Sequence, residues 1–89
     1  MSKDVVREQI CAEVVRLLTA ERKRRRMSGN SLAEKSGLSQ SLISSLETNP
    51  WNPTLDTLLR IAAVLDIKLG DVVNQATKNV EHATKSAAH

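Results

Sequence analysis

Aromatic side chains are almost missing from this chain of 89 residues, which has one tryptophan, Trp51, and no phenylalanine or tyrosine. The core must therefore consist of leucine, valine, isoleucine and alanine, as expected of packed helices. The single cysteine, Cys11, excludes an internal disulfide and fits a reducing compartment. We expect Cys11 to behave as a small apolar side chain.

Residues for catalysis are also scarce, because the chain has three glycines and two histidines. No Ser-His-Asp grouping, glycine-rich phosphate loop or metal-ligand spacing is present. We therefore expect no enzyme activity, cofactor, bound metal or small-molecule substrate. We also expect no signal peptide, and no apolar run approaches the roughly 20 residues that a membrane span needs. We expect a cytoplasmic protein without membrane contact.

Positive charge is concentrated in one place. Of the thirteen basic residues, five are consecutive at positions 22–26, and the remaining eight are outnumbered by ten acidic residues. Such a local cluster indicates a polyanionic partner more clearly than the net charge of +3 does. A solvated helix end is the alternative, since cations also complement the helix dipole.

Residues 31–47 carry the clearest pattern, that of two short helices joined at a glycine. The apolar positions fall on the inner faces of these helices and at the corner between them: Leu32, Ala33, Leu38, Leu42, Ile43 and Leu46. Gly37 can adopt a positive φ and end the first helix, and Ser39 can cap the second. The second helix then presents small polar groups without a carboxylate, which suit the edges of base pairs. This layout predicts a helix-turn-helix.

The motif and the segment after it resemble the Cro/CI-type family, also called the lambda-repressor-like or XRE family. The resemblance covers about residues 14–73, and the matching positions are Leu32, Ala33, Gly37, Ile43, Glu47, Pro53, Leu55, Leu58, Leu59, Ala62 and Leu65. It implies an all-α domain of five helices, with the helix-turn-helix formed by the second and third. Gly29 departs from the family, which often has a glutamine there that contacts phosphate. Asn49 replaces the usual glycine after the recognition helix.

The apolar periodicity places the five helices. We expect them at residues 4–25, 31–36 and 40–47, then after a Thr54 cap, and from about Leu69. Either Ser28 or Asn30 can cap the second helix. The apolar face of the fourth is expected at Leu55, Leu58, Leu59, Ala62, Ala63 and Leu65.

The expected domain spans residues 1–74, with a first helix that extends beyond the family core towards the C-terminal end or a second subunit. Residues 75–89 form a polar, alanine-rich tail. A heptad-like seam of Leu69, Val73, Ala76, Val80, Ala83 and Ala87 favours an extension of the fifth helix. A frayed tail after about Asn74 is the alternative.

The third helix is expected to lie in the major groove. Gln40 is the best candidate for a base contact, because its amide can bond adenine in bidentate fashion. The other candidates for base contacts are Ser41, Ser44 and Ser45, for which a merely solvated surface is the alternative. Phosphate contacts are expected from Arg24, Arg25, Arg26, Ser28, Asn30, Ser31, Asn49, Trp51 and Asn52. Trp51 can equally cover its loop or a dimer seam.

The resemblance also implies a partly buried ion pair between Arg22 and Glu47, which removes Arg22 from the expected DNA contacts. It implies a homodimer, with a seam at Leu69, Val72, Val73 and Ala76.

The expected function is sequence-specific binding of double-stranded DNA at an inverted repeat, by a transcriptional regulator, most often a repressor, of a prokaryote or phage. The alternative is an antitoxin that binds a protein toxin and represses its own operon, or a protein-binding adaptor.

Overall fold

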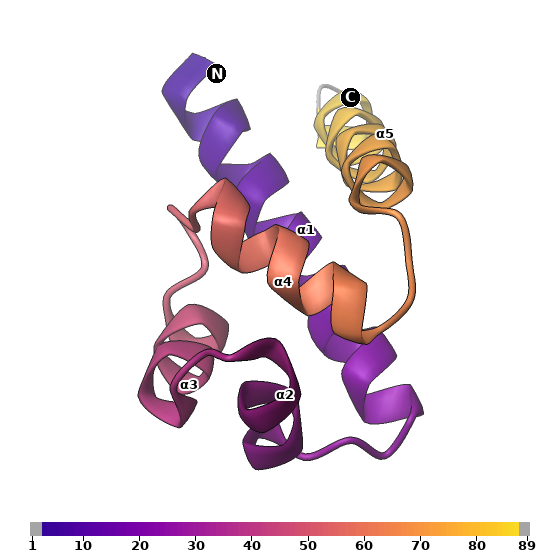
Figure 1. Ribbon diagram of the computed structural model, residues 1–89. Coiled ribbons are helices and arrows are strands. Elements are labelled where there is room, and N and C mark those ends of the chain that lie inside the picture. The colour runs from indigo at the N-terminus through magenta and orange to yellow at the C-terminus, as the bar shows by residue number, and fades with distance from the viewer. Residues whose placement is uncertain (1–2, 88–89) are drawn as a thin grey trace.

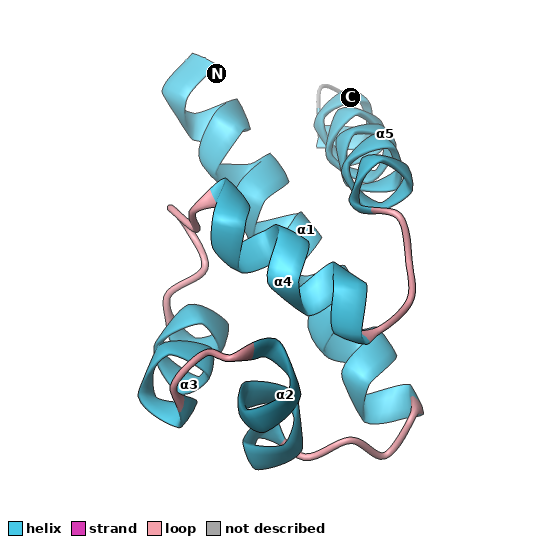
Figure 2. Cartoon of the chain, in the orientation of Figure 1, coloured by secondary structure: helices cyan, strands magenta, loops and turns pink. Residues whose placement is uncertain are grey.

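Helices account for all regular structure in the part of the chain that the computed structural model describes, residues 3–87 (Figures 1 and 2). They are α1 (Lys3–Arg24), α2 (Gly29–Ser36), α3 (Gln40–Thr48), α4 (Leu55–Val64) and α5 (Leu69–Ala87). The expected all-α fold of five helices is thereby confirmed. None of the described helices has the length and apolarity that crossing a bilayer requires.

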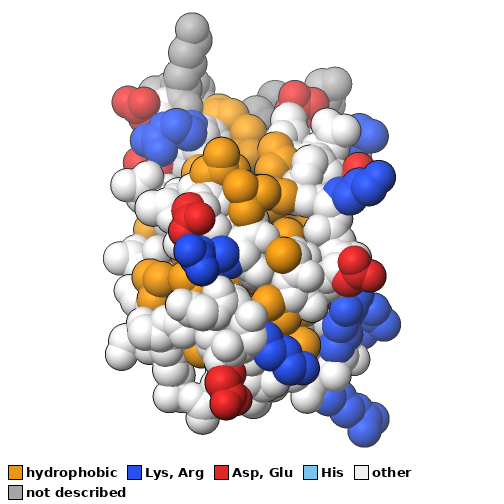
Figure 3. Space-filling model, viewed as in Figure 1, with side chains coloured by type: hydrophobic (Ala, Val, Ile, Leu, Met, Phe, Trp, Pro, Cys, Tyr) orange, Lys and Arg blue, Asp and Glu red, His pale blue; other side chains and the backbone are white. Residues whose placement is uncertain are grey.

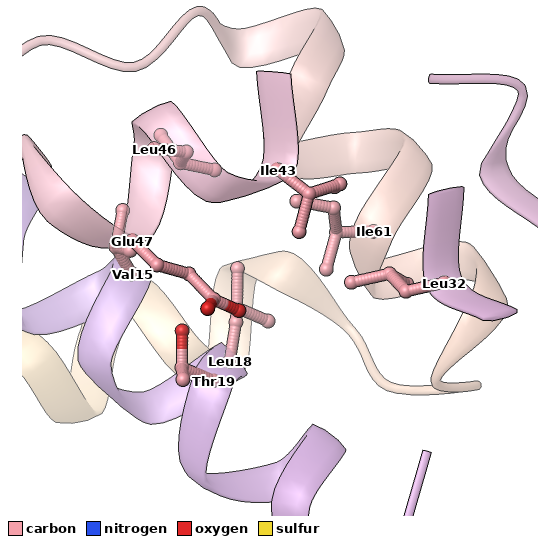
Figure 4. Close-up of a pocket in the computed structure, with 8 residues that line it drawn as sticks. All are labelled: Val15, Leu18, Thr19, Leu32, Ile43, Leu46, Glu47 and Ile61. Atoms are coloured by element: carbon pink, nitrogen blue, oxygen red, sulfur yellow. The ribbon is translucent and has the colours of Figure 1, made fainter. Parts of the chain in front are cut away.

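The helices meet around one aliphatic core. Figure 1 shows α1 running behind α4. The helices α2 and α3 form a corner at the lower left of this view, and α5 lies at the upper right, on the opposite side of α4 from that corner. The core draws on every helix, and its largest fully buried side chain is Leu65 at the end of α4. Figure 4 shows how Ile43 of α3 points towards Ile61 of α4 and Leu32 of α2. The corner is therefore held to the rest of the fold by interlocked aliphatic side chains.

The long α1 packs most extensively against α5. Ala76 and Val80 of α5 are buried, and the Asn79 Nδ2 donates to Glu13 Oε2 of α1 at 2.7 Å. The extended first helix thus lies against the C-terminal helix of its own chain, and α5 continues without a break past residue 74. Cys11 is half-buried and forms no disulfide with another described residue.

The apolar face of α4 is narrower than the sequence predicts. Leu58, Ala62 and Leu65 are buried, but Leu55 and Leu59 are 65% and 50% exposed. Ala63 is exposed as well. The reason is the 3.6-residue period, which places residues 55, 59 and 63 on a stripe turned away from the core. Assigning all six apolar positions to one inner face was wrong.

Three helices end in the left-handed conformation, at Arg26 (φ 56°), Gly37 (φ 74°) and Asp66 (φ 53°). At each end the next amide donates to a carbonyl five residues back, as in the bonds Met27 N to Arg22 O and Ile67 N to Ala62 O, which is the Schellman arrangement. Only one of these positions is glycine. Arg26 and Asp66 therefore pay a steric cost, because the left-handed conformation brings their Cβ atoms close to the following carbonyl oxygen.

Asp66→Gly should therefore raise the free energy of unfolding by about 0.5–1 kcal/mol. Glycine removes the steric cost of the left-handed conformation, although its greater freedom in the unfolded chain offsets part of the gain. Urea unfolding measures the change. Asp71→Gly is the matched control, because the same replacement inside α5 should destabilise by a similar amount. If both replacements changed the free energy of unfolding in the same direction, the steric cost at Asp66 would be contradicted.

Candidate nucleic-acid interface

The corner formed by α2 and α3 is fixed at three points. Ser28 accepts a hydrogen bond from Ser31 N at 3.0 Å, and Ser39 accepts one from Leu42 N at 3.0 Å, so a serine caps each helix. Gly37 turns the chain between them. A Cβ placed on Gly29 would lie 3.9 Å from Ile43 Cγ2, which shows how closely the two helices approach. Since Ser28 is the cap, α2 begins two residues earlier than expected.

The outer face of α3 is polar, exposed and free of charge at its centre. It forms a shallow hollow lined by Gln40, Ser41, Ser44, Ser45, Thr48 and Asn49. The structure thus brings the four predicted base-reading side chains together on one surface. The side chains of these four make no hydrogen bond to other described residues, whereas Thr48 Oγ1 donates to Ser44 O at 2.9 Å. Figure 3 shows this corner, at the lower left, as mostly uncharged surface.

Two residues of this face were not predicted. Thr48 extends the polar hollow by one helical turn. Leu42, which does not line the hollow, has 40% of its surface exposed. Leu42 was expected on the inner face of the helix, which was wrong. At 100° per residue it falls on the flank of α3, between the outward Ser45 and the buried Leu46. Helical-wheel reasoning applied to these nine residues could have found both.

The N-terminus of α2 carries the positive end of the helix dipole, and the first backbone N–H groups of a helix have no acceptor within it. Ser28 and Asn30 are exposed there, and Ser31 is half-buried. Asn49 and Asn52 are exposed in the loop after α3. Asn49 has φ −134°, so it does not use the left-handed conformation of the family's usual glycine.

Trp51 is 48% exposed and lies in a groove between α1 and α5, together with Ala12, Arg16 and Val80. This position fits a side chain that covers the loop against α1. The phosphate contact and the dimer seam, the other two roles expected for Trp51, stay predictions.

The basic cluster is partly neutralised within the chain. Arg24 Nε donates to Glu21 Oε1 at 3.0 Å, and Arg25 Nε donates to Glu21 Oε2 at 2.7 Å. Hydrogen bonds from Arg24 and then Arg25 lower the pKa of Glu21 to about 2, so this carboxylate stays ionised at any pH near neutrality. Arg26 is exposed in its left-handed turn and pairs with no carboxylate among the described residues. Lys23 lies in a groove beside Glu47 and Pro50.

Arg22 plays a different part from the rest of the cluster. Its Nε and Nη2 atoms donate to the two carboxylate oxygens of Glu47 at 3.0 and 3.3 Å, and its Nη1 donates to Met27 O at 2.7 Å. The Arg22 side chain is 10% exposed and that of Glu47 is 29% exposed. One guanidinium therefore ties the end of α3 to the end of α1 and to the turn before α2.

The sequence pattern of the helix-turn-helix family matches residues 18–72. The chain belongs to this family. The matched segment runs from α1 to the start of α5 and includes the whole corner described above, which confirms the resemblance to Cro/CI-type proteins.

Two curated relatives accompany this match. The helix-turn-helix chain is 37% identical over 60 residues to the immunity repressor protein of Bacillus phage phi105, an alignment covering 67% of this chain and 42% of the relative. It is 38% identical over 55 residues to the HTH-type transcriptional regulator SinR of Bacillus licheniformis, covering 61% of this chain and 50% of that protein. The alignments thus span half or less of these relatives. No solved structure gives a significant match.

The predicted dimer residues of this helix-turn-helix protein do not share one surface. Leu69 is 8% exposed and Ala76 is 0% exposed, because both face the core of their own chain. Val72 is half-buried against the core, and only Val73, at 39%, has a largely accessible side chain. The seam that looked like a dimer interface in sequence is mostly the contact of α5 with its own chain.

Proposed function

We propose that this protein binds double-stranded DNA sequence-specifically, as a homodimer on an inverted repeat, and regulates transcription as a repressor. The observation that carries the proposal is the exposed polar face of α3, where the amide of Gln40 and the hydroxyls of Ser41, Ser44 and Ser45 have no partner among the described residues. Family membership and the printed names of the two relatives, a repressor and a transcriptional regulator, support it.

In this proposal α3 lies in the major groove with its first turn against the bases. Gln40 bonds an adenine edge, while the hydroxyls of Ser41, Ser44 and Ser45 bond base edges within their short reach. The exposed Leu42, on the flank of α3, adds an apolar surface for a thymine methyl group. Short hydroxyls accept several bases, so DNA shape and bridging water contribute to the specificity.

Phosphate contacts flank the helix on both sides. The N-terminus of α2, with Ser28, Asn30 and Ser31, offers backbone N–H groups and a positive dipole to one phosphate. Arg24, Arg25 and Arg26 supply the charge that draws the protein to the duplex, and Asn49 and Asn52 contact the strand beyond α3. Two subunits place their α3 helices in successive major grooves, about 34 Å apart.

Selection of binding sites from random double-stranded DNA tests the proposal. The expected result is a palindromic consensus whose half-site centres lie about one helical turn apart. Binding to the consensus should exceed binding to random DNA by at least about 1,000-fold at physiological salt. Weak, steeply salt-dependent binding without a consensus would reject the proposal and favour a protein partner.

Replacing both Arg24 and Arg25 by glutamine should make DNA binding less sensitive to salt. Each lost phosphate contact reduces the slope of log K against log salt by about 0.9, so the double variant should lose between one and two units. Fluorescence anisotropy at four salt concentrations measures the slope. Arg7→Gln, near the opposite end of α1, is the control and should leave it unchanged. An unchanged slope in the double variant would exclude the two arginines from phosphate contact.

A further inference from the structure

The outer stripe of α4 is exposed in the part of the chain that the structure describes. Leu55 and Leu59 are the most exposed of the large apolar side chains, at 65% and 50%, and Ala63 continues their line one turn further. Figure 3 shows orange apolar surface near the centre of this face, where α4 lies in Figure 1, with red and blue side chains beside it. A continuous apolar stripe on a surface helix is a feature of protein interfaces.

Two opposite charges lie along one edge of the stripe. Asp56 and Arg60 follow Leu55 and Leu59 by one residue each, which sets them on the same flank of α4. Arg60 Nε donates to Asp56 Oδ2 at 2.9 Å, and its Nη1 donates to Ser36 O at 3.4 Å. The side chains of Arg60 and Asp56 are 49% and 75% exposed, so both can take a further partner.

We propose that a second copy of this chain docks on the stripe, with the two α4 helices antiparallel about a two-fold axis that passes midway between the levels of Asp56 and Arg60. The axis lies between the helices and perpendicular to them. The charged flanks of the two copies therefore lie on the same side, and Asp56 and Arg60 follow each other in opposite order along the two helices. Asp56 of each copy then faces Arg60 of the other. The apolar stripe and its charged edge are thus both self-complementary, as an isologous contact requires.

The docked copy leaves the base-reading surface free. No residue of the stripe lines the hollow of α3, so the two surfaces can be occupied together. The arrangement also explains how a dimer can form although Leu69 and Ala76 are buried in their own chain. The inference rests on the proposed dimeric DNA-binding function, for which it supplies the interface.

Charge reversal with mixing tests the antiparallel contact. Asp56→Arg puts two positive charges on the flank, and Arg60→Asp puts two negative ones. In a dimer of either variant, like charges would face each other at both pairs. Sedimentation of each variant alone should therefore show a dimer dissociation constant raised at least tenfold. An equimolar mixture should recover dimers, because opposite charges then face each other at both pairs. Circular dichroism checks that each variant is folded. Failure of the mixture to associate would overturn the antiparallel contact.

A second pair of variants separates α4 from α5. Leu59→Asp should yield monomers, whereas Val73→Asp, on the exposed side of α5, should leave the dimer intact. The reverse pattern would move the interface to α5 and overturn the inference. A wild-type chain that stays monomeric at all concentrations would also overturn it. DNA binding is measured separately. Sequence-specific binding by a monomer would support the reading of DNA by α3 but would overturn the dimer and its interface.

Discussion

Glu47→Ala should lower the free energy of unfolding by about 2–3 kcal/mol. The replacement leaves the guanidinium of Arg22 with Met27 O as its acceptor, although the Arg22 side chain is only 10% exposed. Removing one partner of a fully buried ion pair costs about 3–5 kcal/mol. The expected loss is smaller here because the Glu47 side chain is 29% exposed, so water reaches part of the site.

Thermal unfolding followed by circular dichroism measures this effect. For a domain of this size, a loss of 2–3 kcal/mol should lower Tm by roughly 10–20 °C. Glu34→Ala is the matched control: Glu34 is exposed on α2, and its removal should change stability by less than about 0.5 kcal/mol. Equal effects of the two replacements would mean that Arg22 is solvated after the loss of Glu47 and that the pair does not hold α3 in place.

Gln40→Ala should weaken binding to the selected consensus by about 1–3 kcal/mol per half-site, the range for one bidentate base contact. Binding to random DNA should change less than twofold, because phosphate contacts supply that affinity. Gln40 lies at the first position of α3, exposed, with no hydrogen bond from its side chain to another described residue. The alanine variant therefore loses the contact without disturbing the fold.

Binding curves on consensus and random duplexes, measured in parallel, separate the two effects. Gln9→Ala makes the same chemical change on α1 and should alter neither affinity. A loss of the same size on both duplexes would remove Gln40 from base readout. Gly29, where the family often has a glutamine, has no side chain that could hold the Gln40 amide, and that amide makes no hydrogen bond to another described residue. We therefore expect the effect to lie towards the lower end of the range.

The corner of α2 and α3 was predictable from sequence because its determinants are local. Capping by Ser39, the left-handed turn at Gly37 and the inward positions of Ile43 and Leu46 each follow from a few neighbouring residues. The ion pair of Arg22 with Glu47 spans 25 residues and came from the family pattern, since spacing alone cannot bring two such distant side chains together.

The buried face of each amphipathic helix was harder to predict, because the apolar character of a residue does not indicate which other helix it packs against. Helical period and local hydrogen bonds made the five helices, the caps Ser39 and Thr54 and the polar face of α3 predictable from the sequence. The packing of the helices was needed to show that α5 buries Leu69 and Ala76 against its own chain while α4 leaves Leu55 and Leu59 exposed. The physical reason is that burial depends on where the other helices lie, and a core of this size has room for one side of each helix.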